Sequence, residues 1–115
     1  MNLPRTVPSV LGIHASAQGV LTHRCPFVDE TDVGYVEISW RTGWHTLELH
    51  SLAEYLTSYA ERRISHEEAT QEIHYDLQTL PGIDAVSVTT TWTTGGMEVT
   101  CSTSPTPRRL GSEQR

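Results

Sequence analysis

One short segment places a cysteine near carboxylates: Cys25 is followed directly by Pro26 and, seven residues on, by Asp32. A thiolate attacks electrophilic carbon, and a nearby carboxylate can take and return the proton. Because the residue before a proline is biased away from the α region, we expect Cys25 at a strand end or in a loop. The alternative is a small buried thiol, the usual state of cysteine in soluble domains.

A second pair of residues that could take part in binding or chemistry is His66-Glu67, in the first turn of a predicted helix. There the unpaired backbone N–H groups and the helix dipole favour an anion or a polar ligand. The alternative is structural, because a glutamate in the first turn complements the dipole and a histidine beside it can simply be exposed.

A zinc site from His23, Cys25 and a further histidine is conceivable, since residues two apart on a strand point the same way. No CxxC, HxxxH or HExxH motif accompanies them, and no glycine-rich phosphate loop or Gly-x-Ser-x-Gly elbow is present. We therefore predict no metal. Cys101 shares a strand face with Met97 and Val99, which predicts a packed thiol.

The length, charge and cysteine content of the chain indicate which broad kinds of protein it fits. At 115 residues the chain fits one domain, and its net charge of −6 argues against generic binding to nucleic-acid backbones. No run of apolar residues is long enough to span a membrane, and the N-terminus lacks a secretory pattern. Two cysteines form no disulfide framework, so a reduced, cytoplasmic setting is expected.

Period-two alternation and turn residues predict the strands that hold these side chains. Extended structure runs from Val10 to Arg24, and the clearest alternation covers residues 33–41, with Thr46–Glu48 as an extension or short partner. Alternation resumes over residues 85–92, and Gly95-Gly96 connects it to a last strand at 97–101.

Two helices are predicted between these strand pairs, each from a capping box. Ser51-Leu52-Ala53-Glu54 begins the first, and Ser65-His66-Glu67-Glu68 begins the second, which Pro81-Gly82 ends. The order ββααββ predicts an α+β fold in which an antiparallel sheet carries both helices on one face. The other face would pack against copies of the chain, so an oligomer is expected.

We expect residues 1–9 to be a loose lead-in, residues 10–104 to be a single domain and residues 105–115 to be a disordered tail.

These motifs, in their order, resemble the QueF family. They are Cys25-Pro26 with Asp32, then the run from Glu48 to Leu56, then His66-Glu67, then Thr94-Gly95-Gly96. The resemblance covers about residues 20–103 and implies the tunnelling fold (T-fold), an oligomeric barrel whose pockets lie between subunits. It also implies the family's activity on 7-cyano-7-deazaguanine (preQ0), in queuosine- and archaeosine-type pathways.

The resemblance implies a role for each matching residue. Cys25 would attack the nitrile carbon and form a covalent thioimide, and Asp32 would carry the thiol proton to the nitrile nitrogen. His66 would sit beside the reacting carbon as a proton donor or orienter. Glu67 would accept hydrogen bonds from the base, with Leu47 and Glu48 also lining the base pocket.

Three departures concern the family's cofactor, NADPH. His50 and Ala53 stand where the family has lysines, and Thr94 stands where it has arginine. Because phosphates call for cationic donors, these losses favour, by a small margin, addition of ammonia to the thioimide to give an amidine. Reduction to the aminomethyl product, with His50 and Gly95 at the cofactor, is the alternative.

Two further questions concern the kind of function and the substrate. The alternative to an enzyme is a non-catalytic module that binds deazaguanine. The acidic chain favours a free base as substrate, while a tRNA or DNA substrate stays open.

Overall fold

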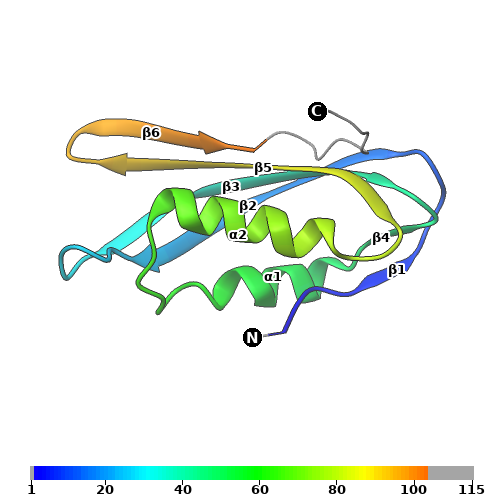
Figure 1. Cartoon of the computed structure of the whole chain (residues 1–115), viewed down its shortest axis with the longest axis horizontal. Coiled ribbons are helices and arrows are strands. Elements are labelled where there is room, and N and C mark those ends of the chain that lie inside the picture. The colour runs from blue at the N-terminus through cyan, green and yellow to red at the C-terminus, as the bar shows by residue number, and fades with distance from the viewer. Residues whose placement is uncertain (1, 104–115) are drawn as a thin grey trace, which may run out of the picture.

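A four-stranded antiparallel sheet forms the centre of the protein (Figure 1). The structure, a computed structural model, describes residues 2–103. The sheet has the order β2-β3-β5-β6, built from β2 (His14–Arg24), β3 (Thr31–Thr42), β5 (Ile83–Thr94) and β6 (Met97–Ser102). The predicted ββααββ order of this sheet and its helices is confirmed.

Two helices cover one face of this sheet, α1 (Leu49–Thr57) and α2 (His66–Gln78), as Figure 1 shows. Alternate residues of the central strands point toward them and are buried, while their neighbours face the other side. Burial of these apolar side chains is the main stabilising term of the fold. The largest buried side chains of the core are Trp92, Tyr55, Tyr59, Leu21, Ile38, Ile73 and Leu77.

The start of α1 differs from the prediction. The helix begins at Leu49, and Glu48 rather than Ser51 is the N-cap, accepting hydrogen bonds from the backbone N–H groups of His50 and Ser51. The Ser51 hydroxyl instead donates to the Glu48 carbonyl and accepts from the backbone of Arg5. The Glu48 carboxylate thus satisfies two of the free N–H groups at the helix start, and the helix begins ahead of the serine.

The start of α2 follows the prediction. Ser65 accepts a hydrogen bond from the backbone of Glu68, and the Glu68 carboxylate accepts from the backbone of Ser65. This reciprocal capping box makes His66 and Glu67 the first two residues of the helix.

Residues near the N-terminus are more ordered than the predicted lead-in. A short strand β1 (Thr6–Pro8) pairs antiparallel with β4 (His45–Leu47), which follows β3. Proline removes only one donor, so a short edge strand tolerates Pro8. The predicted tail, residues 105–115, lies outside the described residues.

The face of the sheet away from the helices carries exposed apolar side chains. Val20, Val33 and Tyr35 are each more than half exposed. Among residues 2–103, no helix is long and apolar enough to cross a membrane.

Candidate active site

The candidate site lies where β2 ends, β3 begins and α2 begins. Cys25 directly follows β2, in the loop that connects it to β3, as predicted. Its backbone N–H donates to the Glu30 carbonyl at 2.9 Å, so the strand pairing continues one step beyond Arg24 and Thr31. The Cys25 thiol is half-buried and accepts a hydrogen bond from the Phe27 backbone at 3.4 Å.

Two arginines tie this loop to the segment before α2. Arg24 pairs with Asp29 at 2.8 Å, and Arg63 pairs with the same carboxylate at 3.2 Å. Arg63 also donates to the Cys25 carbonyl at 3.1 Å. These bonds, first of all that from Arg24, hold the pKa of the Asp29 carboxyl below its usual range. The backbone of Arg24 adds hydrogen bonds to Arg62 and Ile64, so Cys25 is held beside the start of α2.

Asp32 faces His23 across the β2–β3 pair. The Asp32 carboxylate lies 3.7 Å from His23 Nδ1, and the His23 side chain is fully buried. Cys25 is two residues beyond His23 on the same chain segment, and diagonal neighbours across a strand pair lie about 7–8 Å apart. The fold therefore brings Cys25 and Asp32 into one neighbourhood.

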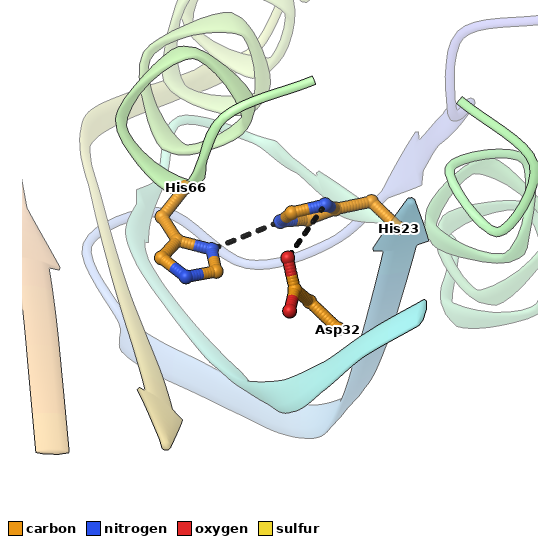
Figure 2. A group of neighbouring side chains, drawn as sticks. All are labelled: His23, Asp32 and His66. Atoms are coloured by element: carbon orange, nitrogen blue, oxygen red, sulfur yellow. Dashed lines mark hydrogen bonds and ion pairs between the residues drawn. The ribbon is translucent and has the colours of Figure 1, made fainter. Parts of the chain in front are cut away.

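His66 completes a cluster with His23 and Asp32, shown in Figure 2. Its Nδ1 lies 3.0 Å from Nε2 of His23, and its Nε2 lies 3.3 Å from the Thr94 hydroxyl. The His66 ring stacks on the Trp92 indole, with centroids 4.4 Å apart and an interplanar angle of 12°. Burial lowers the pKa of His66, and His23 acts in the same direction, while Asp32 and Glu67 oppose them.

Trp92 forms the inner wall of this cluster and is itself held by buried hydroxyls. Its indole N–H donates to the Thr90 hydroxyl at 2.9 Å, which lies 2.6 Å from the Thr70 hydroxyl. Thr70 donates in turn to the His66 carbonyl at 2.7 Å. The ring behind His66 is therefore fixed by both β5 and α2.

Glu67 is exposed and opens onto a shallow groove between α2 and β6. Thr70, Cys101 and Thr103 also line this groove. Burial, followed by the Glu67 charge, raises the pKa of the half-buried Cys101 thiol. Glu67 is thus available to a ligand in the groove.

Leu47, Glu48 and His50 lie elsewhere. They lie at the end of β4 and just after it, so the length of β3 separates them from Asp32. The ten residues from Asp32 to Thr42 span roughly 33 Å at strand spacing. Figure 1 shows the β2–β3 loop and β4 at opposite ends of the sheet. The Leu47 side chain is buried, and His50 is exposed and lies 3.1 Å from Glu48.

Gly95 and Gly96 form the two-residue turn between β5 and β6, with φ of 61° and 78°. Positive φ at both positions is what this type of hairpin requires. The turn places Thr94 beside His66.

Side chains that could bind a metal ion lie in the cluster. They are not the same residues as those considered for a zinc site from the sequence. Ligand atoms of His23, Asp32 and His66 lie within 4.8 Å of one another, and Cys25 is not part of this set. His23 already has a partner at each nitrogen, Arg24 O at 3.2 Å and His66 at 3.0 Å.

Comparison with known sequences finds the QueF-like protein family over residues 31–108. The chain belongs to this family. A 52-residue segment is 36% identical to the NADPH-dependent 7-cyano-7-deazaguanine reductase of Prochlorococcus marinus (strain NATL2A), over 45% of this chain and 37% of that protein. A 56-residue segment is 38% identical to the reductase of the same name from Microcystis aeruginosa (strain NIES-843 / IAM M-2473), over 49% and 43%. The matched segments span less than half the length of these relatives.

The fold agrees with this membership. The crystal structure of the archaeosine synthase QueF-Like in the apo form matches with a TM-score of 0.75, over 78% of this chain and 90% of that chain. The identity is 20%, so the likeness concerns the fold, an α+β T-fold unit.

The grouping of His23 with Asp32 and His66 was not predicted. From the sequence, His23 was considered only as part of a zinc site with Cys25 and a further histidine. The alternation of β2 and β3 carries a signal for this pairing. In a hairpin whose loop starts near Cys25, residues at equal distance from the loop on the two strands face each other, as His23 and Asp32 do.

Proposed function

We propose that this protein activates the nitrile of 7-cyano-7-deazaguanine through Cys25. The observation that carries the proposal is that the cluster of His23, Asp32 and His66 lies at the end of the sheet where the β2–β3 loop carries Cys25. Membership of the QueF-like family supports it, as do the names of the matching reductases.

The first step needs one nucleophile and one proton carrier. The Cys25 sulfur bonds to the nitrile carbon as one π bond of the nitrile opens, and the thiol proton moves through Asp32 to the nitrile nitrogen. A covalent thioimide results, with no change in electron count. Glu67 accepts hydrogen bonds from N–H groups of the base, which lies along the groove between α2 and β6.

For the second step we favour amidination. Ammonia adds to the thioimide carbon, and the C–S bond breaks to give an amidine and the free Cys25 thiol. The residues present fit the phosphates of NADPH poorly, because the first turns of α1 carry the exposed His50 and Ala53. Arg5, which precedes β1, reaches the start of α1 but is already paired with the N-cap Glu48 at 3.1 Å. Reduction is the alternative outcome of the test below.

A complete pocket requires a second copy of the chain. Leu47 and Glu48 lie at the opposite end of the sheet from Cys25, so they reach a shared pocket only from another subunit. The exposed apolar side chains Val20, Val33 and Tyr35 on the helix-free face support an oligomeric, barrel-like assembly. Mixing Cys25→Ala subunits with Glu48→Ala subunits should then restore part of the activity, and two inactive variants that never complement would contradict a shared pocket.

The test is intact-protein mass spectrometry after incubation with 7-cyano-7-deazaguanine. The wild type should gain the mass of one substrate, and Cys25→Ala should gain nothing. Cys101→Ala changes the groove that holds the base but keeps the nucleophile, so it should still form the adduct. Ammonia and NADPH are then added separately to the adduct. Release of an amidine identifies amidination, and release of the aminomethyl base identifies reduction.

Two results would contradict the proposal. An unmodified wild type rules out the covalent step. Binding of the base that is unchanged in Cys25→Ala, with no adduct and no product, indicates a binding module instead. Parallel incubations with a deazaguanine-containing tRNA or DNA compare polymer with free base.

A further inference from the structure

We propose that His23 is a positioning residue that holds His66 with its proton on Nδ1, so that Nε2 is unprotonated and can accept a proton from the reacting group. The hydrogen-bond chain through His23 is an observation on the free protein. Its use in the reaction rests on the proposed function, in which His66 stands beside the reacting carbon.

The direction of the chain follows from the groups at its two ends. His23 Nδ1 faces the Arg24 carbonyl at 3.2 Å and the Asp32 carboxylate at 3.7 Å, and both are acceptors. Nδ1 of His23 therefore carries the proton, and Nε2 of the neutral ring is an acceptor. His66 Nδ1, 3.0 Å away, must then be the donor.

Once Nδ1 of the neutral His66 carries its proton, Nε2 has none. The Thr94 hydroxyl, 3.3 Å from Nε2, donates to it. Nε2 of His66 is thus an acceptor and a base that a substrate can use in place of the Thr94 hydroxyl, and His66 becomes a proton donor only after taking a proton at Nε2. This defines the role that the sequence left open between donor and orienter.

Burial makes this arrangement specific. His23 is fully buried and packs against Trp92, with ring centroids 4.6 Å apart, so its ring has little freedom to turn. A buried acceptor without a hydrogen-bond donor costs free energy. This disfavours the opposite tautomer of His66, because it would leave the lone pairs of His23 Nε2 and His66 Nδ1 facing each other with no hydrogen between them. The titratable groups facing His66 are His23 on β2, Asp32 on β3 and Glu67 on α2.

Two substitutions separate this role from simple packing. In His23→Gln, the side-chain carbonyl takes the position of Nε2 and still accepts from His66. In His23→Asn, the amide takes the position of Nδ1, keeps the contact with the Arg24 carbonyl and loses the acceptor for His66. His14→Gln, at an exposed histidine at the start of β2, is the control.

The first measurement is the tautomer of His66 by ¹⁵N–¹H NMR of the imidazole rings, on the protein without substrate. We expect the Nδ1–H form in the wild type, in His14→Gln and in His23→Gln, and the Nε2–H form in His23→Asn. The second measurement is the rate at which the Cys25 adduct is converted to product. It should fall about 100-fold in His23→Asn, the contribution typical of a positioned acid–base group, and stay close to the wild type in His23→Gln.

Each failure has its own signature. A wild type that forms no adduct refutes the proposed function and leaves the tautomer result standing. An Nε2–H tautomer of His66 in the wild type, or a His23→Asn variant with wild-type tautomer and conversion rate, overturns the inference. Stoichiometric zinc in the purified protein, lost in His23→Asn, overturns it too, since His23 would then be a ligand.

Discussion

Replacing Gly34 by alanine should damage the fold and the candidate site together. Gly34 lies on β3 directly opposite Trp92 and faces the core. A Cβ added at this position would lie 2.6 Å and 2.9 Å from two carbons of the Trp92 ring, and closer still to the Thr91 carbonyl oxygen. The backbone oxygen belongs to the sheet and cannot rotate away, so the strands themselves must shift.

Overpacking of this kind typically costs about 1–3 kcal/mol, and we expect the upper half of that range because backbone is involved. For a domain of this size, such a loss lowers the Tm by roughly 10–20 °C. The matched control is Gly19→Ala on β2, where an added Cβ meets nothing within 4 Å. That substitution should be neutral or stabilise by about 0.4–1 kcal/mol, since it reduces the freedom of the unfolded chain.

Urea titrations of both variants at one protein concentration give the free energies of unfolding. The double variant Gly34→Ala/Trp92→Phe should recover part of the loss, because the smaller ring frees space and couples the two sites. Equal stability of Gly34→Ala and Gly19→Ala would refute the packing argument.

Three further predictions concern the helices. Tyr55→Phe removes the hydroxyl that donates to Asp76 at 2.6 Å, and urea titration should show a loss of about 1.5–3 kcal/mol, as for bonds to charged groups. Hydrogen bonds from the Ser51 and His50 backbone lower the pKa of Glu48 from 4.5 to about 2, so its stabilisation is complete above pH 4.5 and is lost as the pH falls toward 2. The gap in urea midpoint between wild type and Glu48→Gln should close over that range. Ser65→Ala removes half of a capping box, should cost about 1 kcal/mol in thermal unfolding, and should broaden the NMR signals of His66.

Much of the fold could be predicted because local signals agreed with the tertiary arrangement. The alternation of Val36, Ile38 and Trp40 marks the buried face of β3, and the capping box at Ser65 marks the start of α2. The first helix began earlier than expected because two caps competed, and the sequence does not show that the Glu48 carboxylate reaches the N–H groups first. The pairing of β1 with β4 was missed because contacts between distant residues leave no local pattern.

The candidate site was predicted only where its residues carry recognisable motifs. His66 and Asp32 lie in one cluster with His23, and Cys25 lies in the loop beside it, while Leu47, Glu48 and His50 lie at the other end of the sheet. His23 entered the cluster through strand register and burial, which depend on the exact position of the loop between β2 and β3.

Because Trp92 stacks on His66, its intrinsic fluorescence depends on the state of the cluster. The indole lies against two imidazoles, with ring centroids 4.4 Å from His66 and 4.6 Å from His23. A protonated imidazole quenches indole emission more strongly than a neutral one. Ultraviolet fluorescence of the unlabelled protein therefore reports the charge of the cluster in real time. With Trp40→Phe and Trp44→Phe removing the other two indoles, the remaining signal would come from Trp92 alone.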